Sequence, residues 1–195
     1  MGSNKNLVLD FKHAMTREFE MTDLGLMKYF LGLEIRQGNF GIFVSWEAYA
    51  RNILKKNKME NYKLVATPME LGTKLSRFEG GDQVNAHGYR SLVGSLGYLA
   101  CIRPDIAYSA GVVSRCLEDS RHSHLEAIKR ILRYIRGTES LRLLYTKSSE
   151  YKLIGYLDSN WCGDIDDRKS MRGYVFYMEN TTFTWLSKKQ PIVTL

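Results

Sequence analysis

Apolar positions recur at a helical period in the first part of the chain and at a strand period soon after it. The helical run repeats every four residues, at Leu7, Phe11, Met15 and Phe19. This spacing predicts a helix over residues 6–21 with one apolar stripe. Residues 29–36 and 40–45 are rich in aromatic and β-branched side chains, and they predict two strands joined by a hairpin turn at residues 37–39.

Helical patterns dominate the middle of the chain. They predict four helices, over residues 46–58, 86–102 and 104–117 and over a last segment that ends at Gly137. Ser45 is expected to cap the first of these helices, and Ser120 or Ser123 the last. Residues 61–85 contain Pro68 and several glycines, and they predict a long loop.

From Leu141 onward the apolar period changes to two. Strands are predicted near residues 141–146, 152–158, 173–178 and 183–187. The order of elements predicts an α+β fold, with an N-terminal helix and β-hairpin, then a helical bundle, then an antiparallel sheet.

Composition excludes several classes of protein. With 44% hydrophobic and 12% aromatic residues, the 195-residue chain can bury a core, which excludes disorder along its whole length. The longest uncharged apolar run, residues 92–102, is far shorter than the roughly 20 residues of a membrane-spanning helix. The N-terminus lacks the apolar segment of a secretory signal, so we expect an intracellular protein, cytoplasmic or nuclear. The cysteines are few and widely spaced, which predicts reduced core thiols.

A surplus of positive charge lies in the helical region. Residues 84–149 contribute +5 of the net charge of +7. In the last predicted helix the cations lie opposite the apolar stripe, at Lys129, Arg130, Arg133 and Arg136. Such a face is typical of phosphate binding by a protein with a nucleic-acid partner. It is equally typical of a solvated helix surface, so the pattern leaves both interpretations open.

Asp158 is the most distinctive candidate for a chemical role, because it ends an apolar strand where a carboxylate has no use in the core. Such an aspartate can bind a metal ion for phosphodiester chemistry, or it can cap the turn that follows. The acidic cluster at residues 164–167 does not match a calcium loop, because Lys169 stands where that loop needs glycine.

Two shorter patterns have structural interpretations. His122 and His124 lack further ligands at the spacing of a zinc site, so helix capping or solvent exposure is expected. Gly94 and Gly97 lie inside a predicted helix, where small residues commonly allow a neighbouring helix to pack closely. Neither pattern predicts a catalytic site.

Four segments carry a family resemblance, and they occur in the family's order, at residues 18–32, 89–107, 132–138 and 158–191. They include the sequences EFEMTDLG at residues 18–25, RPDIA at residues 103–107 and WLSKKQP at residues 185–191. In these segments the chain resembles the Pol polyprotein of copia-type LTR retrotransposons. The resemblance implies the C-terminal part of a reverse transcriptase followed by the start of a ribonuclease H domain.

The resemblance also implies roles for particular residues. Phe30, Leu31 and Gly32 are similar to the turn of the primer grip, the hairpin that positions the primer end. Asp158 aligns with the first metal-binding aspartate of ribonuclease H. The chain departs from the family at Asn160, where the family has an aspartate.

The implied domains divide the chain into three parts. Residues 1–45 resemble the end of the polymerase palm, residues 46–140 resemble a thumb-like helical region, and residues 141–195 resemble the beginning of ribonuclease H. The family covers the last sheet with later helices, so Val175 and Trp185 are expected to lie in an exposed apolar patch together with Phe183.

The resemblance places the polymerase aspartate pair before this sequence and the rest of ribonuclease H after it, so we expect a fragment that is catalytically inactive alone. Its expected partner is an RNA/DNA template–primer duplex, held weakly and without sequence specificity. No membrane partner is expected. Mg²⁺ serves the parent family and is not expected to bind tightly here. The alternative is a domesticated fragment that acts as a protein-interaction module.

Overall fold

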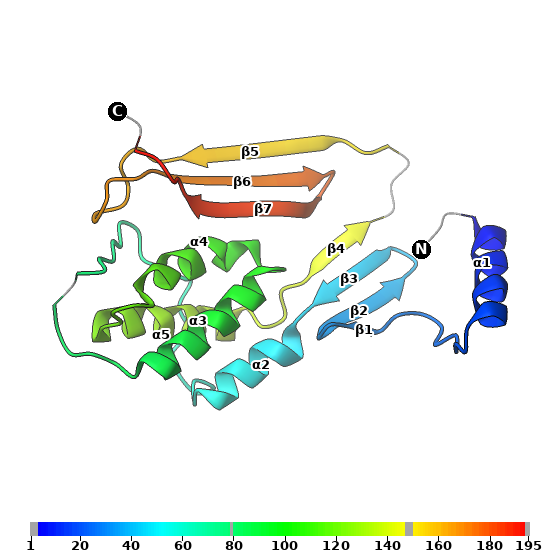
Figure 1. Ribbon diagram of the computed structural model, residues 1–195, viewed down its shortest axis with the longest axis horizontal. Coiled ribbons are helices and arrows are strands. Elements are labelled where there is room, and N and C mark those ends of the chain that lie inside the picture. The colour runs from blue at the N-terminus through cyan, green and yellow to red at the C-terminus, as the bar shows by residue number, and fades with distance from the viewer. Residues whose placement is uncertain (1–3, 79, 147–149, 194–195) are drawn as a thin grey trace.

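A computed structural model describes residues 4–78, 80–146 and 150–193. Within these ranges the chain forms α-helices, one short 3₁₀ helix and two antiparallel sheets, so the predicted α+β fold is confirmed (Figure 1). In chain order the elements are α1 (Lys5–Glu18), β1 (Tyr29–Phe30), β2 (Leu33–Gly38), β3 (Gly41–Ser45), α2 (Glu47–Lys56), α3 (Ala86–Ala100), α4 (Pro104–Val113), η1 (Ser114–Cys116), α5 (His122–Gly137), β4 (Leu143–Thr146), β5 (Leu153–Ser159), β6 (Met171–Met178) and β7 (Thr181–Lys189).

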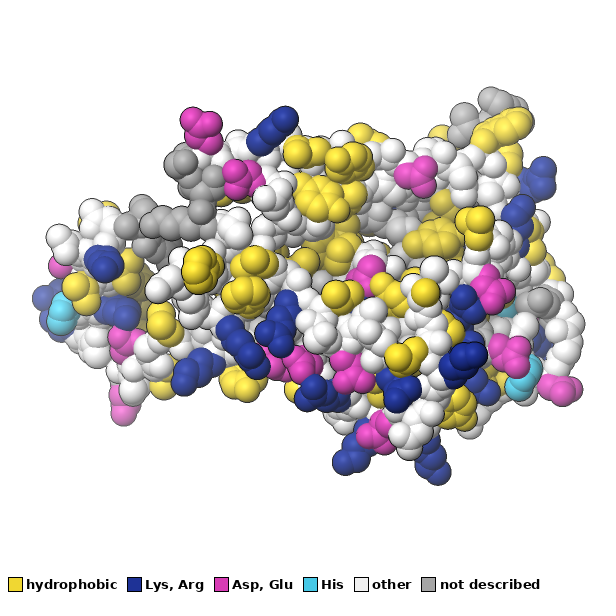
Figure 2. Space-filling view, turned by 180° about the vertical axis from the view of Figure 1, so that it is seen from behind, with side chains coloured by type: hydrophobic (Ala, Val, Ile, Leu, Met, Phe, Trp, Pro, Cys, Tyr) yellow, Lys and Arg dark blue, Asp and Glu magenta, His cyan; other side chains and the backbone are white. Residues whose placement is uncertain are grey.

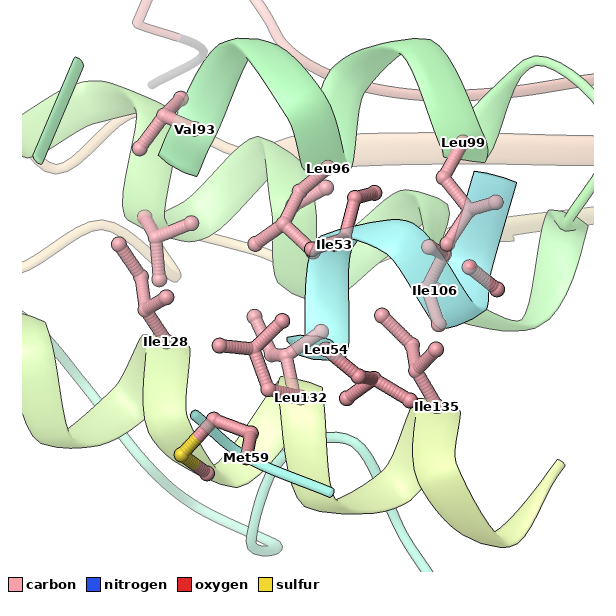
Figure 3. Packing of buried hydrophobic residues seen from close by; sticks show 14 of the residues in the cluster. Ile53, Leu54, Met59, Val93, Leu96, Leu99, Ile106, Ile128, Leu132 and Ile135 are labelled. Atoms are coloured by element: carbon pink, nitrogen blue, oxygen red, sulfur yellow. The ribbon is translucent and has the colours of Figure 1, made fainter. Parts of the chain in front are cut away.

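Helices α2, α3, α4 and α5 bury their apolar sides in one common core (Figure 3). Helix α5 contributes a row at helical spacing, Ile128, Ile131, Leu132 and Ile135, each at most 1% exposed. Leu96 of α3 and Leu54 of α2 complete this layer. The Tyr89 hydroxyl is buried in the core and donates a hydrogen bond of 2.8 Å to the carbonyl oxygen of Val113. Burial raises the pKa of Tyr89, so this hydroxyl keeps its proton.

The first sheet has the strand order β1-β2-β3-β4, so the chain returns to it after the helices. Strand β4 pairs with β3 through Val44 and Leu143 rather than with the strands that follow it. At the start of β3, a Cβ atom on Gly41 would lie 2.2 Å from the carbonyl oxygen of Tyr145. Only glycine therefore allows β4 to pair so closely at this point.

The predicted strand at residues 29–36 is interrupted. The chain turns at Leu31 and Gly32, whose φ angles are +49° and +80°, and this turn separates β1 from β2. The hairpin turn between β2 and β3 is also shorter than predicted, because Gly38 pairs directly with Gly41. Two residues, Asn39 and Phe40, make the turn.

The predicted serine caps are wrong for both helices. Ser45 ends β3 and is buried, while the start of α2 is capped from the neighbouring strand by Glu34, whose Oε1 accepts the backbone N–H of Ala48 at 2.8 Å. At the start of α5, the backbone N–H of Arg121 donates to Nδ1 of His124 at 3.0 Å.

His124 therefore fulfils the capping role predicted for one of the two histidines. Its ring is fully buried, and Nε2 lies 2.9 Å from the carbonyl oxygen of Ser76. Because Nδ1 accepts a hydrogen bond, Nε2 is the ring nitrogen that donates to this carbonyl oxygen. His122 lies on the surface, where it contacts Glu126 at 3.3 Å.

The second sheet, β5-β6-β7, packs against the helical core through β7 (Figure 1). The indole Nε1 of Trp185 donates to the carbonyl oxygen of Ala100 at the end of α3, at 3.0 Å. The predicted exposed patch is therefore wrong for Trp185 and Val175, which are half-buried; of the three residues, Phe183 alone is in the exposed class, at 42%. The reason is that α3 and α4 of the same chain cover this face.

Exposed apolar side chains lie instead on β5. Leu153, Tyr156 and Leu157 are 64%, 61% and 80% exposed. Figure 2 shows hydrophobic side chains gathered over the strands of this sheet, whereas charged side chains of both signs mix over the helical part below it.

Helix α1 forms but ends three residues earlier than predicted, none of its residues is buried, and Leu7 and Phe11 of its apolar stripe are more than half exposed. The expectation for the cysteines needs correction. Of the three free cysteines, Cys116 is a core thiol, whereas Cys101 is exposed and Cys162 is half-buried.

The common core predicts the result of a cavity-forming substitution. We expect Leu132→Ala to lower the free energy of unfolding by about 2–5 kcal/mol, because Leu132 is 1% exposed and its neighbours cannot fill the space. Urea denaturation followed by circular dichroism measures this change. The matched control is Leu71→Ala, at a fully exposed position, which should change stability by less than about 0.5 kcal/mol. Equal effects of the two substitutions would contradict this assignment of the core.

Candidate nucleic-acid interface

The turn between β1 and β2 presents the residues predicted to form a primer-grip-like hairpin. Phe30 is 51% exposed and Leu31 is 74% exposed. Positive φ angles at both Leu31 and Gly32 are typical of a tight type I′ turn. The three predicted residues therefore lie together at a hairpin tip that a partner can reach.

Tyr98 of α3 holds this hairpin tip. Its hydroxyl donates a hydrogen bond to the carbonyl oxygen of Leu31. Its ring stacks on Trp46, with centroids 4.1 Å apart and planes inclined by 16°. Tyr49 of α2 meets the Tyr98 ring edge-on, at 5.1 Å between centroids. One side chain thus connects the hairpin tip, the β3–α2 junction and α3, and sequence analysis missed it because the contact joins residues far apart in the chain.

The exposed side of α3 continues from this hairpin tip. It carries Arg90, Ser91, Gly94 and Tyr98 at helical spacing, all exposed. The prediction that the glycines serve close helix packing is wrong, because a Cβ atom on Gly94 or Gly97 would meet nothing within 4 Å. Gly94 leaves the backbone of α3 open to close approach from outside, whereas Gly97 lines a cavity between α3 and β7.

The basic side of α5 is partly covered by the loop at residues 61–78. Arg130 donates to Glu70 at 2.6 Å and to Thr67 at 3.0 Å. Arg136 donates to the carbonyl oxygen of Tyr62. Two of the four side chains predicted to bind phosphate are thus engaged in hydrogen bonds with the loop.

The other two cations of this face are half-buried. Neither Lys129 nor Arg133 forms an ion pair with any residue in the described part of the chain.

The same loop is tied to the connection between β5 and β6. Asp166 accepts the Ser76 hydroxyl at 2.5 Å and the backbone N–H of Arg77 at 2.8 Å. The neighbouring Asp164 is 5% exposed and forms ion pairs with Arg115 of η1 and Lys189 of β7. The acidic cluster that fails as a calcium loop therefore organises this end of the sheet.

Asp164 is held in its charged form. Burial alone would raise its pKa, but the backbone N–H groups of Asp166 and Asp167 and the ammonium group of Lys189 together lower the pKa to about 2. Hydrogen bonds and cations that favour the carboxylate thus outweigh the loss of water.

Asp158 lies on β5 opposite Gly173 and is exposed. It lines a cavity of about 520 Å³ between the start of α4 and the second sheet. Asp105 lines the same cavity, but its carboxylate is bound by the guanidinium of Arg103, at 2.7 Å.

The first third of the chain matches a family of known function. Residues 1–71 match the model of the family described as reverse transcriptase (RNA-dependent DNA polymerase). The match covers α1, the first three strands and α2, and therefore includes the hairpin tip. No solved structure matches the chain.

Similarity to individual proteins extends over the rest of the chain. Over its whole length, the chain is 39% identical to part of the retrovirus-related Pol polyprotein from transposon TNT 1-94 of Nicotiana tabacum. Over 97% of its length, it is 35% identical to part of the retrovirus-related Pol polyprotein from transposon RE1 of Arabidopsis thaliana. The chain spans only 15% and 13% of these two polyproteins. It is also 32% identical to an uncharacterized mitochondrial protein of Arabidopsis thaliana, over 99% of the chain and 80% of that protein.

Asp158 aligns by resemblance with a metal-binding aspartate, so the donor groups near it bear on function. Mg²⁺ prefers several oxygen ligands in octahedral geometry. Over residues 4–78, 80–146 and 150–193, no three His, Cys, Asp or Glu side chains are grouped so that they could hold a metal ion. These residues do not by themselves fit a Mg²⁺ site. In the same ranges, no helix combines the length and apolarity needed to cross a membrane.

The Asp164 network predicts a dependence of stability on pH. Because folding lowers the pKa of Asp164 from 3.8 to about 2, its stabilising contribution is complete well above pH 3.8 and is lost as the pH falls through about 2. We expect Asp164→Asn to lower the free energy of unfolding by about 2 kcal/mol near neutral pH. The difference from the native chain should shrink as the pH falls below about 4, because the native carboxylate then takes up a proton.

Urea denaturation between about pH 6 and pH 2 measures this difference. The matched control is Asp158→Asn, at an exposed position, which should change the free energy of unfolding by less than about 0.5 kcal/mol. A loss for Asp164→Asn that stays constant down to the lowest pH would show that the charge of Asp164 does not contribute.

Proposed function

The chain belongs to the copia-type family of retrotransposon Pol polyproteins, and from this membership we propose that it holds the template–primer duplex of a reverse transcriptase. The observation that carries the proposal is the contact of Tyr98 with Leu31. Through it, the hairpin that resembles a primer grip is fixed to the helical bundle that resembles a thumb. A duplex lying across both would be gripped by one rigid unit.

The proposed contact surface consists of the hairpin tip and the exposed side of α3. Phe30 and Leu31 offer apolar contacts to sugars and base edges at the primer end. Gly94 allows the backbone of α3 to approach a groove of the duplex, because no side chain stands between them. Arg90 is exposed on the same helix and supplies a phosphate contact.

The basic side of α5 is the second place for phosphate contacts. Lys129 and Arg133 remain candidates there, whereas Arg130 and Arg136 hold the loop at residues 61–78. Because α3 and α5 turn their buried sides toward the same core, their exposed sides point in different directions. One duplex would not contact both, and we favour α3 because it lies beside the hairpin tip.

We further propose that the palm-like part includes β4, since β4 pairs with β3. The ribonuclease H-like part then begins at β5, and Asp158 would serve as its first metal ligand within a longer polyprotein. This chain's own contribution is to place one carboxylate on β5, in the lining of the cavity beside α4.

Gly94→Leu separates duplex binding from stability. We expect a gain of up to about 1 kcal/mol in the free energy of unfolding, because glycine is a poor helix former and the new side chain meets open space. We expect affinity for an RNA–DNA duplex to fall roughly tenfold, because the leucine would stand between α3 and the groove. Fluorescence anisotropy with a labelled duplex measures the affinity.

Two charge-reversed variants locate the surface further. Arg90→Glu should reduce the slope of log affinity against log salt by about 0.9 per lost phosphate contact on B-form DNA. The double substitution Lys129→Glu and Arg133→Glu should leave that slope unchanged if the duplex lies on α3. Unchanged affinity for Gly94→Leu together with a reduced slope for the α5 variant would move the interface to α5.

We propose that the 195-residue polypeptide alone extends no primer and cleaves no RNA–DNA hybrid. The proposal is supported by the surroundings of Asp158, which in the described ranges belongs to no group of three side chains that could hold a metal ion. Primer extension on an RNA template and cleavage of a labelled hybrid, both with Mg²⁺, test it. Hybrid cleavage that Asp158→Asn abolishes would contradict it.

A further inference from the structure

The loop at residues 61–78 places a carboxylate on the basic side of α5. Arg130 donates from Nη1 to a carboxylate oxygen of Glu70 at 2.6 Å and from Nη2 to the hydroxyl oxygen of Thr67 at 3.0 Å. Two nitrogen atoms of the guanidinium thus each meet an oxygen atom. An arginine binds a phosphate group in a similar way, through two N–H···O bonds. The loop therefore gives Arg130 the kind of oxygen atoms that a phosphate would give it.

A cavity of about 280 Å³ lies beside this contact, between the loop and α5. Arg130 and Arg133 line it from successive turns of the helix. The hydroxyl-bearing side chains of Thr73 and Ser123 also line it. A water molecule takes about 30 Å³ in the liquid, so the cavity has room for a phosphate group. Arginine and hydroxyl side chains are the groups that commonly bind phosphate oxygen atoms.

The charges that line this cavity are balanced while Glu70 is in place. Glu126 is the second acid in the lining, and it contacts His122 at 3.3 Å. Two arginines are thus matched by two glutamates. Within the described ranges, Arg133 forms no ion pair and the buried Nε of Arg130 has no hydrogen-bond partner. Removal of the charge of Glu70 would therefore leave a surplus of positive charge in the cavity.

The carboxylate of Glu70 can leave Arg130 without unfolding the loop. The Glu70 side chain is 67% exposed, and ion pairs in contact with water contribute little to stability. Other contacts hold the backbone nearby, because Met69 packs against the helical core and the N–H of Thr73 donates to the carbonyl oxygen of Glu70 at 3.2 Å. The side chain can therefore turn into water while the loop keeps its place.

We propose that Arg130 and Arg133 form a phosphate-binding site that the native chain keeps closed with Glu70. A backbone phosphate of a nucleic acid would displace the carboxylate and bind both Nη atoms of Arg130, with Arg133 as the second cation. Lys129 lies one turn from Arg133, so the cationic surface continues along α5 beyond the cavity. A continued surface suits a row of phosphates better than a single free phosphate ion.

This inference rests on the proposed binding of nucleic acid and adds a second site to it. The surface on α3 is open in the native chain, whereas the site on α5 becomes available only when Glu70 moves away. The two sites are therefore separable by substitution, because the carboxylate of Glu70 closes only the second.

Glu70→Gln tests the proposal, because it keeps the size of the side chain and removes the charge that competes with a phosphate. We expect tighter binding of a labelled DNA duplex in fluorescence anisotropy. The slope of log affinity against log salt should steepen by about 0.9 for each phosphate newly bound on B-form DNA. Adding Arg130→Gln to Glu70→Gln should remove this gain, whereas Arg130→Gln alone should change the slope little, since the native site is closed.

The matched control is Glu60→Gln, which makes the same charge change at an exposed position just before the loop and should leave the slope unchanged. Urea denaturation confirms that each variant folds. A second variant, Glu70→Gln with Arg133→Gln, should also lose the gain. It does not depend on a weakened loop, because in the described ranges Arg133 has no ion pair to lose.

The outcomes separate the closed site from the surface on α3. Duplex binding that Gly94→Leu weakens and Glu70→Gln leaves unchanged would overturn the closed site alone. Tighter binding by Glu70→Gln that Gly94→Leu does not weaken would support the closed site and overturn the surface on α3. Titration calorimetry with inorganic phosphate tests the source of the phosphate: binding to Glu70→Gln without a steeper duplex slope would overturn the assignment to a nucleic-acid backbone. Absence of duplex binding in every variant would overturn both proposals.

Discussion

The burial of four amphipathic helices against one another is the constraint to which the rest of the chain is fitted. Helices α2 to α5 bury their apolar sides in one shared core, and residues such as Leu96 and Ile131 are completely buried between them. Burial of large aliphatic side chains on this scale is the main favourable term in folding. An aromatic side chain helps to attach each sheet to the outside of this core, Tyr98 for the first sheet and Trp185 for the second.

Both aromatic contacts end on backbone carbonyl oxygens. Tyr98 donates to Leu31 at a turn, and Trp185 donates to Ala100 at a helix end, where carbonyl groups lack partners within the helix. Each contact therefore fixes the position of a backbone segment, whatever side chains that segment carries. The surface that we assign to duplex binding depends on the first contact.

Local periodicity predicted most elements, because the helices and strands of this chain follow their own apolar patterns. The row of Ile128, Ile131 and Ile135 predicted both the existence of α5 and its buried side. Pairing between distant segments could not be predicted in this way. Nothing in the sequence near Leu143 indicates that β4 pairs with β3 about a hundred residues earlier, or that Glu34 caps the start of α2.

The candidate site was predictable only in part, for a chemical reason. Arginine side chains bind carboxylates, carbonyl groups and phosphates with the same geometry, so the sequence could not reveal that Arg130 and Arg136 bind the loop. The resemblance did identify the hairpin tip at Leu31, and the structure places those residues on an exposed turn. Tyr98 was missed because its role depends on its contact with Leu31, which lies far from it in the sequence.

The leucine at the hairpin tip has an energetic consequence. Leu31 adopts a left-handed backbone conformation with φ of +49°, which costs a residue with a Cβ atom about 1 kcal/mol relative to glycine. Its side chain recovers little of that energy by packing, since it is 74% exposed. Folding alone would therefore favour glycine at this position. A leucine there lowers the stability of the isolated chain and leaves an apolar side chain at the hairpin tip for contact with a surface outside it.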